Sequence, residues 1–303
     1  MPVADVVGTV VLPIFLIAAA AAVLHQFRPL PVGPLNTVIV YLFSPALVFH
    51  TLATTELPVG EIGKILLFSF LLLGALYVVA MGSAVVLRLD GSSRGTFVVS
   101  VLFMNAGNYG LPVAMFAFGA AGFSIAIVFF VIQAILGWTV GVFLVAQTRG
   151  GISNGIRSVV RLPTSYAAIA GAAAGTVGIE LPEALMRSSE LLGSAAVPGM
   201  LVVLGIHVVT NRAMSDGPAI VGSLILRLIV SAFVASMLAA VLDFDEIAAR
   251  VLIVSAAMPT AVFTTILAAE FGGRPQMAGS IVVASTVLSL ATVTAVLTIV
   301  GVP

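Results

Sequence analysis

The chain has 303 residues, of which 61% are hydrophobic and only 8% are charged, and its 12 basic and 12 acidic residues cancel. A soluble domain carries roughly 25% charged residues, so this composition excludes an ordinary water-soluble fold. The absence of cysteine excludes disulfides and thiolate catalysis, and the zero net charge provides no basic field for nucleic acid.

The apolar segments predict a multi-pass protein of the cell (plasma or inner) membrane. Positions 95 to 148 contain no charged residue, which is enough for two helices of roughly 20 residues each. The N-terminus lacks a basic region and carries Asp5, so we expect the first apolar run to remain as a span. In chain order, the ten expected spans are 6–25, 35–54, 63–87, 94–119, 122–147, 163–178, 190–209, 218–242, 247–269 and 277–301.

Basic residues in the loops predict the orientation. Ten spans place successive loops on alternating sides, and the side with more basic residues is cytoplasmic by the positive-inside rule. Both termini are then expected outside. The cytoplasmic loops would hold Arg28, Arg88, Arg94, Arg149, Arg157, Arg161, Arg212 and Arg274, and the outer loops Lys64, Arg187 and Arg250.

A glycine-rich cytoplasmic link at 148–162 divides the chain into two halves of five spans, residues 1–147 and 163–303. Because five is odd, the second half would insert upside down, which is the inverted repeat of many secondary transporters. Chance recurrence of proline at span ends is the alternative. The matches at an offset of 153 are Pro29 with Pro182, Pro45 with Pro198, and Phe118-Gly119 with Phe271-Gly272.

Helix-breaking residues interrupt the fourth span at MNAGNYGLP (104–112) and the ninth at SAAMPTAVFTTIL (255–267). Broken helix at membrane depth is tolerated only inside protein or beside a water-filled cavity. Each second half-helix would expose free N–H groups and about half a unit of positive charge, so two such ends favour an anion. The carbonyls that end the first half-helices could instead hold a cation, and simple packing kinks are a further interpretation.

Three stretches carry a family resemblance: FSPALVFHTLA (43–53), MNAGNYGLPVAMFAFG (104–119) and AAMPTAVFTTILAAEFG (256–272). The chain resembles the auxin efflux carrier family, which includes plant PIN-type carriers and bacterial malonate and malate permeases. The resemblance implies the all-α membrane fold of bile-acid symporters and sodium/proton antiporters, with ten helices in two inverted five-helix repeats and with broken helices 4 and 9 crossed. It further implies a scaffold of spans 1, 2, 6 and 7, a transport domain of spans 3–5 and 8–10, and a homodimer through the scaffold.

The same resemblance, carried over by position, implies a substrate site in the two breaks and the neighbouring spans. Arg227 is the only basic residue deep inside a span, where charge is usually functional. It would either serve the substrate or a coupling ion, or donate to carbonyls freed by the broken helices. The candidate substrate-binding residues are Ser44, Pro45, Asn105, Asn108, Tyr109, Pro112, Gln133, Met258, Pro259 and Thr260.

These features predict an elevator-type secondary carrier of small organic anions, such as carboxylates or aromatic weak acids, that needs no cofactor. Coupling to protons or sodium stays open, although the span centres lack the carboxylates of a sodium/proton antiporter. A membrane sensor that binds its ligand without transporting it is the other alternative. An enzyme is not expected, because the sequence has neither an HExxH motif nor a base placed for a serine nucleophile.

Overall fold

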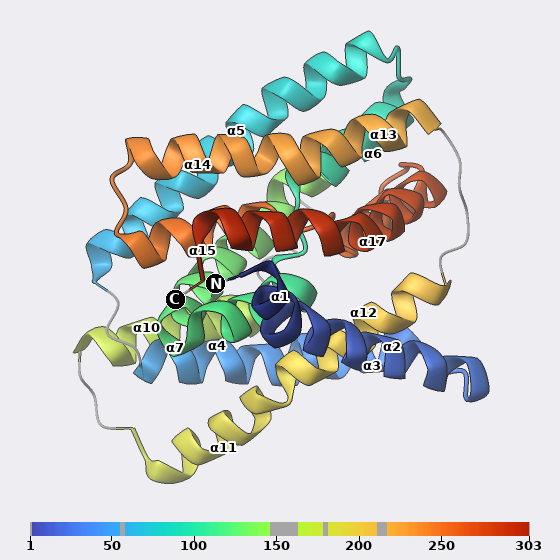
Figure 1. Cartoon of the computed structure of the whole chain (residues 1–303). Coiled ribbons are helices and arrows are strands. Elements are labelled where there is room, and N and C mark those ends of the chain that lie inside the picture. Colours follow the sequence, from blue (N-terminus) through green and yellow to red (C-terminus); the bar gives the residue numbers. More distant parts are fainter. Residues whose placement is uncertain (1, 55–57, 146–162, 178–180, 211–216, 303) are drawn as a thin grey trace.

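The computed structural model describes residues 2–54, 58–145, 163–177, 181–210 and 217–302 (Figure 1). The expected link at 148–162 lies outside these described residues. Within them every regular element is a helix, and Met104 with Thr260 forms the one isolated antiparallel bridge. The all-α class predicted from the sequence is therefore confirmed.

Seven helices in the described part of the chain are long and apolar enough to cross a membrane. This identifies the chain as a multi-pass membrane protein. The seven are Val3–Phe27, Val32–Thr54, Gly60–Val86, Ala106–Val145, Glu183–Thr210, Gly217–Val241 and Pro275–Val300.

Several of these helices contain a π-helical turn, labelled η. Along residues 2–145 the elements are α1 (Val3–Val6), η1 (Val7–Val11), α2 (Leu12–Phe27), α3 (Val32–Val38), η2 (Ile39–Phe43), α4 (Ser44–Thr54), α5 (Val59–Val86), α6 (Gly91–Leu102), η3 (Ala106–Gly110), α7 (Leu111–Leu136), η4 (Gly137–Gly141) and α8 (Val142–Val145). From residue 163 they are α10 (Pro163–Val177), α11 (Glu183–Ser194), α12 (Ala196–Thr210), α13 (Gly217–Ile225), η5 (Leu226–Val230), α14 (Ser231–Val241), α15 (Glu246–Ala256), α16 (Phe263–Glu270) and α17 (Pro275–Val300).

The difference between seven helices and ten expected spans has local causes. The expected ninth span consists of two short helices, α15 and α16, and the expected sixth corresponds to α10, which has 15 residues. The expected fourth and fifth spans meet inside the apolar stretch Ala106–Val145. Gly119 interrupts that stretch with φ 61° and ψ −157°, a conformation that glycine adopts without a steric penalty. The ten-span arrangement stays a prediction.

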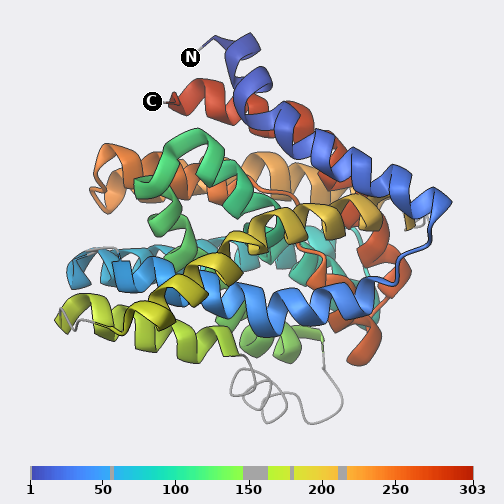
Figure 2. The same cartoon turned by 90° about the horizontal axis from the view of Figure 1, so that it is seen from below.

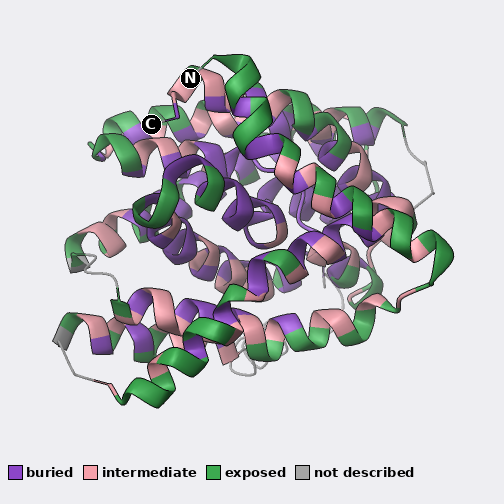
Figure 3. Ribbon diagram, turned by 60° about the horizontal axis from the view of Figure 1, so that its bottom comes forward, coloured by how far each residue is buried: buried purple, intermediate pink, exposed green. Residues whose placement is uncertain are grey.

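The buried residues lie toward the centre of the molecule (Figure 3), and many of the exposed residues on the outer faces are large and hydrophobic. Val78, Val86, Ile169 and Ile299 are between 69% and 82% exposed, and a bilayer would cover such side chains. Buried hydroxyl groups bond back to their own helix, as Ser69 Oγ does to the Ile65 carbonyl at 2.8 Å. The core therefore has polar groups without exposing them to lipid.

Glycines bring pairs of helices into close contact. A Cβ added at Gly205 would lie 2.0 Å from the carbonyl oxygen of Ala18, where α12 packs on α2. One added at Gly171 would lie 2.6 Å from the carbonyl oxygen of Phe49, where α10 packs on α4. Small residues at such contacts are typical of membrane helices, because packing, rather than the hydrophobic effect, holds the helices together in lipid.

Contacts divide the helices into two groups, one toward the bottom and one toward the top of Figure 1, and Figure 2 views the molecule from below, from the side of the first group. In the first group α12 packs on α2, and both α10 and α11 pack on α4. In the second group α5 packs on α6 and α14, and α14 packs on α15. The α7 helix contacts members of both groups, which places the interrupted helices beside the boundary between them.

Two similar turns precede α6 and α15. Arg88 and Asp243 adopt positive φ angles of 53° and 50°, and two residues later an aspartate caps the next helix. Asp90 accepts a hydrogen bond from the Ser93 amide at 2.8 Å, and Asp245 accepts one from the Ala248 amide at 2.9 Å. The bond from the Ser93 amide also holds the pKa of Asp90 below its ordinary value.

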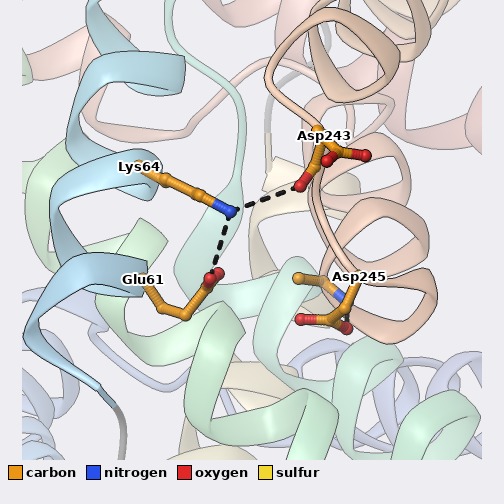
Figure 4. A network of polar contacts seen from close by, with 5 residues as sticks. Glu61, Lys64, Asp243 and Asp245 are labelled. Atoms are coloured by element: carbon orange, nitrogen blue, oxygen red, sulfur yellow. Dashed lines mark hydrogen bonds and ion pairs between the residues drawn. The ribbon is translucent and has the colours of Figure 1, made fainter.

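Lys64 connects α5 to the second of these turns (Figure 4). Its ammonium group lies 3.3 Å from Glu61 Oε1 and donates to the Asp243 carbonyl, also at 3.3 Å. Because Lys64 is 43% exposed, the ion pair contributes at most about 1 kcal/mol. Its effect is to fix where the turn between α14 and α15 lies against α5.

Candidate functional site

Helix α6 stops at Leu102, and helical structure resumes at Ala106. Between them Phe103 is extended, with φ −105° and ψ 112°, and Asn105 has φ −75° and ψ 64°. The second interruption separates α15, which ends at Ala256, from α16, which begins at Phe263. Pro259 lies inside it and has no N–H for a helical hydrogen bond.

The two interruptions lie against each other and pair in antiparallel fashion around a single bridge. The Asn105 amide donates to the Pro259 carbonyl at 2.7 Å, and the Ala261 amide donates to the Phe103 carbonyl at 3.0 Å. These bonds flank the bridge between Met104 and Thr260. The two amides and two carbonyls in these bonds are therefore satisfied without water, as low-dielectric surroundings require.

Carbonyl groups at the ends of both first half-helices also have partners. Thr260 Oγ1 donates to the Ser100 carbonyl at 2.8 Å, and Ser231 Oγ donates to the Ala256 carbonyl at 2.7 Å. The guanidinium group of Arg227, in η5, donates to the carbonyls of Val101 at 2.6 Å and of Ala256. Arg227 is fully buried.

A cavity of about 340 Å³ lies beside the two interruptions, and Arg227 does not line it. The first turns of both second half-helices line it, through Ala106–Asn108 of η3 and through Ala261–Phe263 at the start of α16. Neither half-helix has a side-chain cap on its N-terminus. The N-termini of both second half-helices therefore border one space, and the Ala106 and Ala261 amides there already donate to the carbonyls of Met104 and Phe103.

Two polar side chains on the cavity wall have atoms without a hydrogen-bond partner. These atoms are Asn105 Nδ2, a donor, and Gln133 Oε1, an acceptor in α7, and the two side chains are only 4% and 5% exposed. An unpaired buried polar atom costs about 1–3 kcal/mol, so native proteins keep few of them. Both residues line the same cavity, so a change of side-chain rotamer would bring each unpaired atom within reach of a ligand or water there.

The opposite wall comes from the second apolar segment and from helices α10 and α12. Its polar members are Asn36, Thr37, Ser44, Thr164 and Ser165, and Met200 is its contribution from α12. Aromatic rings of Tyr41, Phe103, Phe130, Trp138 and Phe263 complete the lining, with Trp138 stacked on Phe263 at 6.0 Å. Among the residues that the structure describes, no charged side chain lines the cavity.

Four of the ten candidate residues from the sequence lie on the cavity: Ser44, Asn105, Asn108 and Gln133. Six do not: Pro45, Tyr109, Pro112, Met258, Pro259 and Thr260. Tyr109 is buried and packs edge-on against Phe15 of α2, with ring centroids 5.9 Å apart. Thr260 holds the second interruption in place, since its amide donates to Ser285 Oγ at 3.1 Å.

Of the polar residues on the opposite wall, the sequence interpretation included only Ser44. Asn36 and Thr37 were visible as a polar pair next to the expected second span, and Thr164 and Ser165 as polar residues after Pro163. Nothing in a single sequence indicates that these two segments face the same space. The sequence also gave no sign that Trp138 stacks on Phe263, which is far from it along the chain.

A family model described as "Membrane transport protein" matches residues 6–297, nearly the whole chain. The chain belongs to the membrane transport protein family. This confirms the resemblance to the auxin efflux carriers that the sequence motifs carried. The protein that contains this cavity is therefore a membrane transporter.

Relatives in this family carry transporter names. The chain is 28% identical over 280 residues to a Rhizobium meliloti protein named "Putative malonate transporter", covering 88% of this chain and 86% of that one. It is 26% identical over 271 residues to an uncharacterized transporter of Methanocaldococcus jannaschii, covering 84% and 85% of the two chains. An uncharacterized transporter of Methanothermobacter thermautotrophicus matches with 27% identity over 206 residues, 67% of each chain.

Proposed function

We propose that this membrane transporter is a secondary carrier of small organic anions, which bind in the cavity between the two interrupted helices. The observation that carries the proposal is the convergence of two helix N-termini, neither with a side-chain cap, on one cavity that Asn105, whose amide donor is unpaired, also lines. Helix N-termini bind anions because their N–H groups are free and the helix dipole is positive there.

The electrostatics of the cavity favour a single negative charge. Each helix N-terminus acts as about half a positive unit, so the two together balance about one carboxylate. The described lining supplies amides, hydroxyls and aromatic rings, but no cationic side chain for a second negative charge. A monocarboxylate with an apolar body, in the manner of an aromatic weak acid, therefore fits better than a dicarboxylate.

The proposal includes the inverted repeat of five plus five spans. Both first half-helices follow a positive-φ residue and an aspartate cap, at Arg88 and Asp90 in one half and at Asp243 and Asp245 in the other. Gly119 and Gly272, which the offset of 153 pairs, both have positive φ. These recurrences support two related halves, with the interrupted helices crossing where Met104 pairs with Thr260.

The proposed mechanism is alternating access by an elevator-like motion. The two groups of helices correspond to the scaffold and the transport domain that the family resemblance implies. The cavity lies between them, because α3, η2, α10 and α12 form one wall and the interrupted helices form the other. We expect both termini outside the cell membrane and a homodimer formed through the scaffold.

Uptake into proteoliposomes tests the proposal. Benzoate and malonate serve as labelled probes of the one-charge and two-charge classes, and the carrier should exchange internal for external benzoate in preference to malonate. Saturable binding without exchange would instead indicate the sensor alternative. No binding of either probe would contradict the site.

Variants connect the transport activity to the cavity. Asn105→Ala and Gln133→Leu remove the two unpaired groups, and each should lower benzoate affinity, Asn105→Ala the more strongly because it removes a donor to the carboxylate. A hydrogen bond to a charged group is worth about 1.5–3 kcal/mol, or roughly ten- to a hundredfold in affinity. Gln26→Leu, at an exposed position in α2, is the matched control and should leave affinity unchanged.

A further inference from the structure

Arg227 lies where the carbonyl ends of the two first half-helices converge. From η5 its Nη1 atom donates to the carbonyls of Val101 at 2.6 Å and of Leu102 at 3.4 Å, at the end of α6. Its Nη2 atom donates to the carbonyl of Ala256, at the end of α15, and to Ser231 Oγ. One side chain therefore joins both interrupted helices.

Each of the last four carbonyls of both first half-helices accepts a hydrogen bond. In α6, Val99 accepts from the Phe103 amide, Ser100 from Thr260 Oγ1, and Val101 and Leu102 from Arg227. In α15, the amides of Ala257 and Met258 bond to Ile253, Val254 and Ser255, and Ala256 accepts from Ser231 and Arg227. Helix ends normally leave these carbonyls for a cap, water or a ligand.

The charge of Arg227 also matches these helix ends. Each C-terminus carries about half a negative unit, so two of them together balance one guanidinium group. In the described part of the chain no acidic side chain forms an ion pair with Arg227. Its planar fork of donors reaches carbonyls from different segments, a geometry that the single ammonium group of lysine does not reproduce.

We propose that Arg227 is a resident cation that takes the place of a coupling metal ion at the converging half-helix C-termini. The carbonyls that would otherwise form a sodium site are occupied by the protein's own guanidinium group. Arg227 does not line the cavity, so it acts by positioning the two interrupted helices and not by touching the substrate. Anion binding on the other side of the interruptions then proceeds without sodium.

The unmodified protein provides the first test. Its melting temperature in detergent is measured in sodium chloride, potassium chloride and choline chloride at equal ionic strength. A ligand that binds the native state raises the melting temperature, so an occupied site predicts the same value in all three salts. A higher melting temperature in sodium than in choline would overturn the proposal.

Variants of Arg227 provide the second test. Arg227→Ala empties the position, and we expect a melting temperature several degrees lower, which millimolar sodium or methylguanidinium partly restores. Arg227→Lys keeps a positive charge and should melt at an intermediate temperature with no response to sodium. Arg187→Ala, which removes a cation from an exposed ion pair with Glu183, is the control and should acquire no cation response.

A merely structural arginine gives a different result. Arg227→Ala would then melt at a lower temperature in every salt alike, with no rescue by methylguanidinium, and that outcome contradicts the proposal. If Arg227→Ala does not fold, the unmodified protein still tests the proposal, because a higher melting temperature in sodium than in choline would overturn it. All these melting measurements are made without substrate, so they stand even if no carboxylate proves to be transported.

Discussion

The backbone and the side chain of Asn105 have separate roles in the structure. Its backbone completes the contact between the interruptions, because its amide donates to Pro259 and its carbonyl accepts from the Gly110 amide at 2.9 Å. Its side-chain amide is left unpaired beside the cavity. A substitution at Asn105 would therefore change the proposed ligand contact, while the backbone bonds that shape the break remain available.

Asn108 and Tyr109 are neighbours in sequence with different surroundings. Asn108 lies on the cavity, whereas Tyr109 is fully buried against Phe15 and does not line it. Asn108→Ala should weaken carboxylate binding by several-fold or more, because it removes a polar group from the first turn of η3. Tyr109→Phe should keep the affinity within about twofold, since the ring packing is retained.

Isothermal titration with benzoate measures both effects. The proposal would be weakened if Tyr109→Phe lost as much affinity as Asn108→Ala, because the site would then extend into the region of Phe15.

Sequence alone placed both residues in the candidate site, since a motif gives no direction for individual side chains. The sequence also left the role of Arg227 open, because its position was equally compatible with contact to a ligand and with hydrogen bonds to helix carbonyls.

The interrupted helices are the elements on which the site depends. The sequence predicted a break in each, because glycines, asparagines and Pro259 oppose a continuous helix there. It did not predict which residues are non-helical. Pro112 lies directly after the π-helical turn η3, six residues beyond the start of the second half-helix at Ala106, so the proline is inside that half-helix and not at the break.

Introduced cysteines test the contact between these elements. The bonds on either side of Met104 and Thr260 make them a non-hydrogen-bonded antiparallel pair, for which Cα atoms lie about 4.5 Å apart. That separation suits a disulfide. Because the chain has no cysteine, a Met104→Cys, Thr260→Cys double variant should form a single defined disulfide after mild oxidation in native membranes.

Mass spectrometry of the digested protein detects the linked peptides. Pairing Met104→Cys with Ser236→Cys, a position in α14 that is exposed on the surface, is the control and should give no link. Two free thiols in the oxidised Met104 and Thr260 variant would mean that the interruptions lie apart. The inverted crossing of the fourth and ninth spans would then lose its support.

At the scale of the whole molecule, the cavity is assembled from segments that are far apart in the sequence. Asn36 and Thr37 come from α3, Thr164 and Ser165 from α10, and the helix N-termini from the two halves of the chain. Composition predicted the membrane class, and motifs predicted the family and the breaks, because those depend on local residues. The far wall depends on how distant helices pack, which no local pattern encodes.

The most direct measurement is a cryo-electron microscopy structure of the protein with saturating benzoate. We predict the carboxylate at the junction of the two second half-helices, within about 3.2 Å of Asn105 Nδ2 and of the backbone amides of Gly107 or Asn108, with its ring against the aromatic wall. Arg227 should remain bonded to the carbonyls of α6 and α15. A carboxylate bound by Arg227, or bound outside this cavity, would contradict an anion site built from helix N-termini.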